Sequence, residues 1–199
     1  MKLSISNIAW AVESDDEIHT LLKESGYRGL EIAPTRIIPE KPYENVPLAV
    51  EFSNNLKNRY GLAISSMQSI LFGVNERLFA SEEERAILVE YTKKAIDFAK
   101  AISCRNLVFG SPKNRVIDNM NQYPHAIDFF RELGDYAWNN NTVLSIEPNP
   151  PIYNTNFINR TQEAFNIVKE VDLPGFKVNV DFGTIIENGE SVDMIAKNI

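Results

Sequence analysis

The apolar positions of the chain follow two spacings in turn, one typical of helices and one of short strands. Ser14 with Glu17 has the form of a capping box, and Ile18 and Leu21 continue the apolar face of a helix. Gly26 follows where a C-cap glycine belongs, and a short apolar run then predicts a strand. The same alternation recurs along the sequence, so the chain is expected to form a series of strand–helix units.

Six consecutive units account for nearly the whole chain. The predicted strands are 3–8, 29–32, 62–67, 106–109, 142–147 and 176–181, and the predicted helices begin near residues 14, 47, 81, 121, 161 and 191. Each parallel return of the chain needs a crossover, so strands that alternate with helices predict an α/β fold with a parallel sheet.

Two parallel architectures compete, an open doubly wound sheet and a closed (β/α) barrel. The first turn, residues 9–13, contains no glycine, whereas a doubly wound nucleotide-binding fold usually has a glycine-rich first turn. In the stretch 176–181 one face is apolar and the other carries Lys177, Asn179 and Asp181. A partly polar inner face and an apolar outer face suit a barrel with helices outside, so the pattern predicts a TIM-barrel type fold.

Charge and composition argue against two kinds of partner. The net charge is -7 and the basic residues are scattered, whereas nucleic-acid binding needs a concentrated basic face. No apolar run approaches the ~20 residues of a membrane span, and the N-terminus does not have the pattern of a secretory signal. The single cysteine, Cys104, is expected to be a small buried hydrophobe. We therefore expect a cytoplasmic protein.

Acidic residues stand at the ends of three predicted strands. Glu31 lies near the end of the second strand, Glu147 ends the fifth and Asp181 ends the sixth. Neighbouring strands lie roughly 4.8 Å apart and barrel active sites lie at their carboxyl ends, so Glu147 and Asp181 have the spacing to share a Mg²⁺ or Mn²⁺ ion. The alternative is structural, in which such an acid caps the next helix or pairs with Lys177.

Five short segments of the sequence form a recognisable set: residues 5–10 (ISNIAW), 26–32 (GYRGLEI), 108–112 (VFGSP), 145–149 (SIEPN) and 180–184 (VDFGT). In this order along the chain they resemble the sugar phosphate isomerase/epimerase family of the xylose isomerase-like barrel superfamily. The resemblance implies a metal-dependent isomerase or epimerase of sugars, sugar phosphates or polyols. It implies Mn²⁺, Mg²⁺ or Co²⁺ held by a Glu, an Asp, a His and a second Glu on strands five to eight.

Glu147 and Asp181 match the first two ligand positions of that family. The resemblance also implies that Glu147 is catalytic, as an acid or base that moves a proton beside a carbonyl through an enediolate. Side chains near the strand ends are further candidates to contact a sugar or polyol: Trp10, Glu31, Gln68, Asn149 and Asn154. These five assignments rest on position along the predicted strands.

The chain departs from the family in two ways. Thr184 stands where the family often has a histidine. The 199 residues hold six units, so we expect a single domain, 1–199, without strands seven and eight and their ligands, against about 250 residues in a complete barrel. His19 and His125, both expected on the outside of helices, do not replace those ligands. The open sheet edges predict a homo-oligomer, or a barrel completed by another chain.

Three functions remain open from the sequence. The first is the isomerase or epimerase that the resemblance implies. The second is a catalytically inactive barrel that serves as a ligand-binding or interaction module. The third is a dehydratase or lyase of the same superfamily. The related DNA-repair endonucleases are excluded, because they need several histidines and a basic DNA-facing surface.

Overall fold

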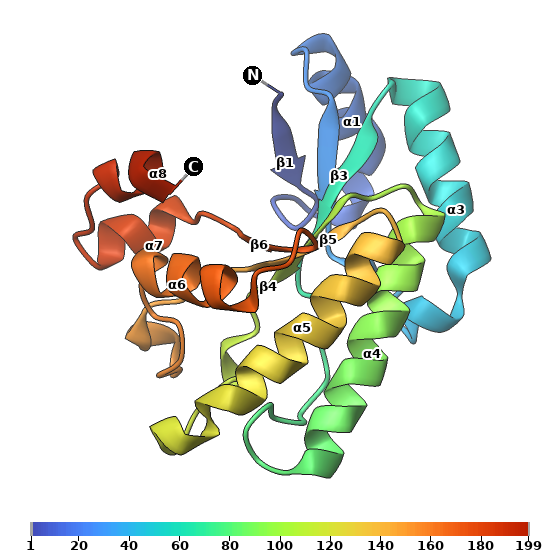
Figure 1. The fold of residues 1–199 in the computed structure, drawn as a ribbon. Coiled ribbons are helices and arrows are strands. Elements are labelled where there is room, and N and C mark those ends of the chain that lie inside the picture. Colours follow the sequence, from blue (N-terminus) through green and yellow to red (C-terminus); the bar gives the residue numbers. More distant parts are fainter. Residues whose placement is uncertain (1, 199) are drawn as a thin grey trace.

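Six parallel strands form one sheet whose order in space is the order in the chain. The computed structural model describes residues 2–198. Its strands are β1 (Ser4–Ser6), β2 (Gly29–Ile32), β3 (Ala63–Met67), β4 (Asn106–Phe109), β5 (Val143–Ile146) and β6 (Phe176–Val178), and each pairs in parallel with the next (Figure 1). This confirms the predicted α/β fold and its TIM-barrel-like course, with an open sheet of six strands.

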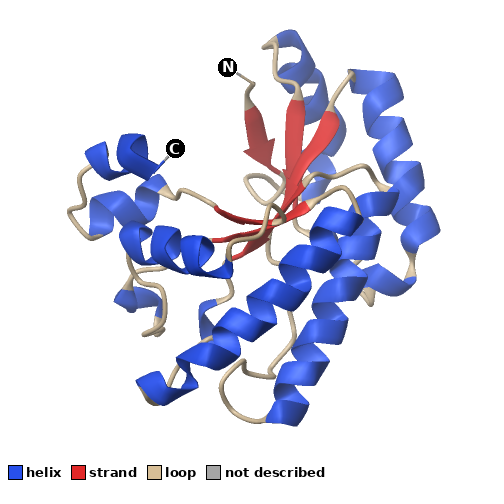
Figure 2. Cartoon of the chain, viewed as in Figure 1, coloured by secondary structure: helices blue, strands red, loops and turns tan. Residues whose placement is uncertain are grey.

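Helices connect the strands and cover the outer face of the sheet, as Figure 2 shows. The helices are α1 (Asp15–Glu24), α2 (Pro34–Ile37), α3 (Val46–Asn55), α4 (Glu82–Ala101), α5 (Tyr123–Asn139), α6 (Thr161–Val171), α7 (Phe182–Glu187) and α8 (Asp193–Asn198). Short helical turns lie between them at Val12–Ser14, Pro42–Glu44, Leu56–Tyr60, Pro112–Asn114, Met120–Gln122 and Pro151–Tyr153. No helix within residues 2–198 combines the length and the apolar character that crossing a bilayer requires.

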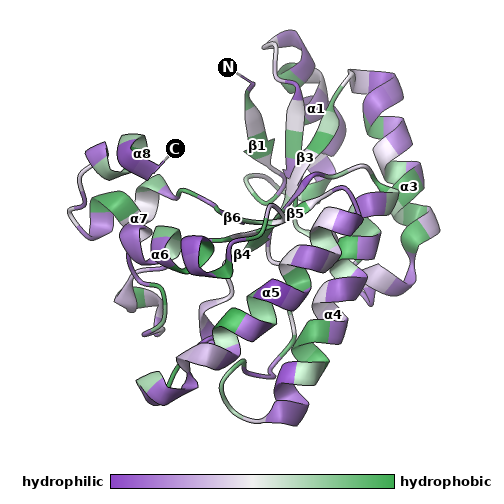
Figure 3. Cartoon of the chain, viewed as in Figure 1, coloured by the Kyte–Doolittle hydropathy of each residue, from purple (hydrophilic) through white to green (hydrophobic). Residues whose placement is uncertain are grey.

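The core lies between the outer face of the sheet and the helices. Leu144, Ile146 and Phe176 point outward from β5 and β6 and are completely buried, as the alternation predicted. Phe130 of α5 stacks on Phe176 with ring centroids 4.5 Å apart. The long helices α4 and α5 contain both apolar and polar residues along their length (Figure 3), and their buried residues are almost all apolar. Burial of these side chains fixes the strand registers and thereby decides which residues point inward.

Several local predictions hold and others are wrong. Ser81 accepts a hydrogen bond from the amide of Glu84 and caps α4, and Gly26 ends α1 with φ 78°.

Ser14 makes no side-chain cap, because a helical turn at Val12–Ser14 leads directly into α1. Leu21 is 54% exposed and not part of the core. The helix α7 was missed. The strands β2 and β4 have the predicted bounds and the other four are shorter, and residues that follow β5 and β6 line the pocket.

The prediction that His19 lies on the outside is wrong. Its ring is only 4% exposed and packs edge-on against Trp10 and at a tilt against Tyr60, with centroids 6.0 and 5.2 Å away. Burial lowers the pKa of His19 below its ordinary value, against the opposing charge of the nearby aspartates. His125 is exposed on α5, and Cys104 is buried, as expected.

We propose that the two edges of the sheet mediate contacts between chains. In the described residues β1 pairs only with β2, and β6 only with β5. Large apolar side chains are exposed next to these edges, among them Ile8 after β1 and Ile186 in α7, at 57% and 77%. Unpaired strand edges and exposed apolar groups both favour association.

Light scattering at micromolar concentration is therefore expected to show an oligomer that Ile186→Glu weakens, because the charge opposes burial of the α7 surface. Leu48→Glu is the matched control, since Leu48 is 55% exposed on α3, away from both edges. A monodisperse monomer of the unchanged chain would contradict this proposal.

Candidate active site

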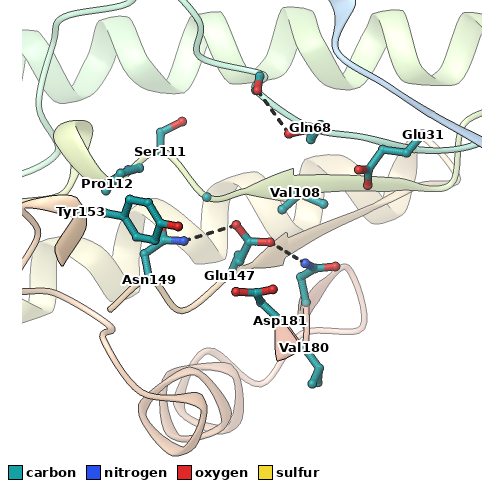
Figure 4. Close-up of a pocket in the computed structure, with 13 residues that line it drawn as sticks. Glu31, Gln68, Val108, Ser111, Pro112, Glu147, Asn149, Tyr153, Val180 and Asp181 are labelled. Atoms are coloured by element: carbon teal, nitrogen blue, oxygen red, sulfur yellow. Dashed lines mark hydrogen bonds between the residues drawn. The ribbon is translucent and has the colours of Figure 1, made fainter. Parts of the chain in front are cut away.

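A polar pocket of about 520 Å³ opens at the carboxyl ends of the strands. It is lined by Glu31, Gln68, Ser69, Val108, Gly110, Ser111, Pro112, Glu147, Asn149, Tyr153, Asn179, Val180 and Asp181. Figure 4 shows Glu147 and Asp181 side by side on one wall and Glu31 with Gln68 on the facing wall. The structure thus brings together five of the seven residues predicted for the site: Glu31, Gln68, Glu147, Asn149 and Asp181.

Glu147 follows β5 and points into the pocket because its predecessor, Ile146, is buried on the outer face. Two amide groups hold its carboxylate. The side-chain nitrogen of Asn179 donates to Oε1 over 2.8 Å, and that of Asn149 donates to Oε2 over 3.3 Å. Each carboxylate oxygen has two lone-pair sites, so both oxygens keep a site for a ligand.

Two opposing effects act on the proton affinity of Glu147. Burial raises its pKa above the ordinary value, because the charged form loses water, and the charge of Asp181 raises it further. The amides of Asn149 and Asn179 and the more distant charge of Arg115 act in the opposite direction. Burial prevails, so Glu147 binds a proton more readily than an exposed glutamate does.

Gly110, directly after β4, leaves the space that the Glu147 carboxylate occupies. A Cβ at this position would lie 2.6 Å from Oε2 of Glu147, closer than side-chain contacts occur in proteins. Any other residue at position 110 would displace the carboxylate. The sequence motif Gly110-Ser111-Pro112 therefore has a steric role in addition to ending a strand.

Asp181 caps the short helix α7. Its Oδ1 accepts from the amide of Gly183 over 3.1 Å, and its Oδ2 accepts from the amide of Thr184 over 2.8 Å. The hydroxyl of Thr184 lies 2.8 Å from both Oδ2 and the carbonyl of Pro148 and shares its single proton between them. The structural alternative considered for this acid is therefore realised, and Asp181 also lines the pocket. Thr184, where the family often has a histidine, is completely buried and links Asp181 to the segment after β5.

Arg115 is the residue that sequence reasoning missed most clearly. Its side chain is fully buried and donates to the carbonyls of Phe157 and Glu147 over 2.6 and 2.8 Å, and to Oδ1 of Asn149. A weaker contact of 3.4 Å reaches the carbonyl of Gly110. Burial without a contacting carboxylate lowers the pKa of Arg115 to about 10. One guanidinium thus fastens the segments that follow β4 and β5.

The facing wall comes from β2 and the end of β3. Ser66 donates to Oε2 of Glu31 over 2.7 Å, and Gln68 donates to the hydroxyl of Ser6 over 2.6 Å. The register between β2 and β3 shifts at Ser65, an irregularity that allows Ser66 to stand opposite Glu31.

Two predicted substrate contacts lie outside the pocket lining. The indole of Trp10 donates to Asp15 over 2.8 Å and packs against His19, in the turn before α1. Asn154 is exposed at the end of the turn Pro151–Tyr153, with φ 58°. Its neighbour Tyr153 lines the pocket instead. A position after a predicted strand did not suffice to place these two side chains in the pocket, because the direction of a long loop depends on its own packing.

Asn179 and Arg115 differ in how far the sequence indicated them. Asn179 lies on the inward face with Asp181, so strand alternation placed it next to the site before its bond to Glu147 was known. Arg115 stands in an irregular loop among polar residues, where no periodicity indicates the direction of a side chain. Only the folded loop shows what it contacts.

The described residues do not form a complete metal site. Glu147 and Asp181 supply two carboxylates, and no group of three or more His, Cys, Asp or Glu within residues 2–198 has the arrangement to hold an ion. Three hydrogen bonds to Asp181 occupy part of its acceptor capacity. Half of the ligand set that the resemblance implies is present, and half is not.

The fold and the polar pocket at its strand ends define a TIM-barrel-type protein. The model of one family, described as xylose isomerase-like TIM barrel, matches residues 20–198. The chain belongs to this family. A comparison with curated protein sequences gave no significant match.

Solved structures share the fold at low sequence identity. A 3-keto-D-glucoside 4-epimerase, YcjR from E. coli, superposes with a TM-score of 0.77 at 18% identity over 100% of this chain and 75% of its own. A D-psicose 3-epimerase from Clostridium cellulolyticum H10 gives 0.79 at 16% identity over 100% and 69%. The probable 3-DHS dehydratase AsbF from Bacillus anthracis gives 0.72 at 20% identity over 100% and 69%.

Replacement of Arg115 tests its structural importance. Arg115→Leu is expected to lower the free energy of unfolding by about 3–5 kcal/mol, since several buried acceptors lose their donor at about 1–3 kcal/mol each. Urea denaturation measures this change. Arg131→Leu is the control, because Arg131 also donates to a backbone carbonyl, that of Glu170, but on the surface, and a loss within about 0.5 kcal/mol is expected. Equal losses of unfolding free energy in the two variants would contradict the structural role assigned to Arg115.

Metal binding by the chain alone is expected to be weak. Two carboxylates, one of them used as a helix cap, provide too few ligands for the six or more oxygens that hard cations prefer. Calorimetric titration with Mn²⁺ is expected to give a dissociation constant above about 0.1 mM, or less than 5.5 kcal/mol of binding free energy. Tight stoichiometric binding would show that donors beyond Glu147 and Asp181 complete the site.

Proposed function

We propose that the protein is an isomerase or epimerase of sugars or polyols that moves a proton at the carbon next to a carbonyl. Family membership and the epimerases among its structural neighbours support this class of reaction. The observation that carries the proposal is the Glu147 carboxylate, half-buried in a polar pocket and held by two amide donors.

Glu147 supplies the base. A carboxylate oxygen takes the proton from the carbon, and the negative charge moves onto the substrate oxygen to give an enediolate. In an isomerisation the same oxygen returns the proton to the neighbouring carbon, after a hydroxyl proton has moved between the two oxygens of the enediolate. In an epimerisation another acid returns a proton to the opposite face of the same carbon. Asn179 and Asn149 keep the carboxylate in one orientation during both steps, and Gly110 leaves the room that it needs.

The raised pKa of Glu147 suits this task, because a general base works best when its pKa approaches the working pH. Only the ionised form accepts a proton. The rate is therefore expected to rise as pH increases through the raised pKa and to level off above it. The acid limb of the pH profile would lie above the ordinary glutamate value of 4.5.

Glu147 and Asp181 would supply some of the ligands of a divalent cation, Mn²⁺, Mg²⁺ or Co²⁺, but not a complete set. Bound there with ligands from outside the described residues, it would polarise substrate oxygens. The two carboxylates do not fit a complete site by themselves, so the proton transfer is assigned to Glu147 without it.

Proton exchange with solvent tests the proposal. Ketoses such as D-tagatose and D-fructose are incubated in D₂O with and without Mn²⁺, and ¹H NMR follows the loss of the proton next to the carbonyl. Glu147→Gln is expected to reduce exchange about 10²–10⁴-fold, the typical contribution of a general base. Glu83→Gln, on the exposed first turn of α4, is the control and keeps the full rate.

Two alternatives give other results in the same assay. A dehydratase, which the neighbour AsbF favours, also uses a base next to a carbonyl but expels the neighbouring hydroxyl, so an unsaturated product would accumulate. An inactive binding module would show no exchange in either variant while remaining folded. Either outcome would replace the isomerase assignment.

A further inference from the structure

We infer that Glu31 and Gln68 form a second, distal subsite that reads the hydroxyl groups of an uncharged polyol and rejects phosphorylated or carboxylated substrates. The inference rests on the proposed function, since it names the class of substrate that Glu147 would act on. It concerns the wall that faces Glu147 across the 520 Å³ pocket (Figure 4).

The two side chains are held in place by partners behind them. Ser66 donates to Oε2 of Glu31, and the amide of Gln68 donates to Ser6. Both side chains are only partly buried, and both line the pocket. The register shift at Ser65 sets Ser66 opposite Glu31. A wall that is already hydrogen-bonded before a ligand arrives loses little conformational entropy on binding.

The unused hydrogen-bonding capacity of this wall matches hydroxyl groups. Within residues 2–198, Oε1 of Glu31 has no hydrogen-bond donor and is left as an acceptor. In the described part of the chain Gln68 keeps one N–H, and its Oε1 accepts only from Ser69 over 3.3 Å. A hydroxyl group both donates and accepts, so neighbouring hydroxyls on one molecule satisfy Glu31 and Gln68 together. A phosphate dianion has no proton for Glu31, and an ammonium group has no acceptor for Gln68.

The charge of the pocket opposes an anion. Three carboxylates line it: Glu31, Glu147 and Asp181. No lysine or arginine belongs to the described lining, and the nearby Arg115 directs its donors to backbone carbonyls and Asn149. The amides at the start of α7 are likewise already bound, by Asp181. Arg115 and the amides of α7 are therefore already engaged, while the carboxylates repel a phosphate.

Binding measured without turnover tests this inference. Saturation-transfer NMR competition compares D-tagatose and D-fructose with D-fructose 6-phosphate and with D-glucosamine, at two salt concentrations. The neutral ketoses are expected to bind at least tenfold more tightly than the phosphate ester. Binding of the ester is expected to improve with salt, because ions screen the repulsion. Glu31→Gln is expected to reduce the ratio of the dissociation constants of the phosphate ester and the ketoses at least threefold. The control Glu83→Gln is expected to leave this ratio unchanged.

Four results would overturn the inference. The first is a phosphate ester or an amino sugar that binds as tightly as the ketoses. The second is a ratio of dissociation constants, ester to ketose, that Glu31→Gln does not alter, and the third is no ketose binding up to 100 mM. The fourth is loss of solvent exchange in Glu31→Gln at unchanged affinity, which would assign proton transfer to Glu31. Glu147→Gln removes one of the three carboxylates and is expected to narrow the ratio of dissociation constants as well, while ketose binding persists. Failure of exchange in the unchanged chain, with its preference for ketoses intact, would reject the proposed reaction alone.

Discussion

The buried guanidinium of Arg115 is the interaction on which the pocket depends. Transfer of a charge into a protein interior costs several kcal/mol unless hydrogen bonds compensate for the lost water. Arg115 obtains that compensation from carbonyls of separate loops and from Asn149, so the loops cannot separate without exposing unpaired groups. Asn149 in turn donates to Glu147. The position of the proposed base therefore follows from a residue that does not line the pocket.

The pocket wall around Glu147 balances two requirements. A base must be ionised to accept a proton, yet burial favours its protonated form. Two amides moderate the effect of burial, and they do so without adding a full positive charge beside the carboxylate. Gly110 serves the same end by sterics, because its missing side chain lets Oε2 lie close to the backbone after β4. Orientation and proton affinity are thus set by the same few contacts.

Asp181 shows why one acidic residue at a strand end supports two interpretations. Its carboxylate caps α7 through three hydrogen bonds and still lines the pocket beside Glu147. The cap fixes the carboxylate in one orientation, which is also what a ligand of a metal or of a sugar hydroxyl needs. A structural role and a binding role are therefore compatible at this residue, provided that further donors complete any metal site.

The sequence by itself determined the strand–helix order and the parallel sheet, because these follow from local periodicity, and it placed Glu147 and Asp181 at strand ends. It also identified Glu31 and Gln68 at strand ends. Only the tertiary structure decided that Trp10 and Asn154 lie outside the pocket, that Arg115 lies beneath it and that His19 is buried. Those residues stand in loops or at helix starts, where side-chain direction depends on contacts with segments that are distant in the chain.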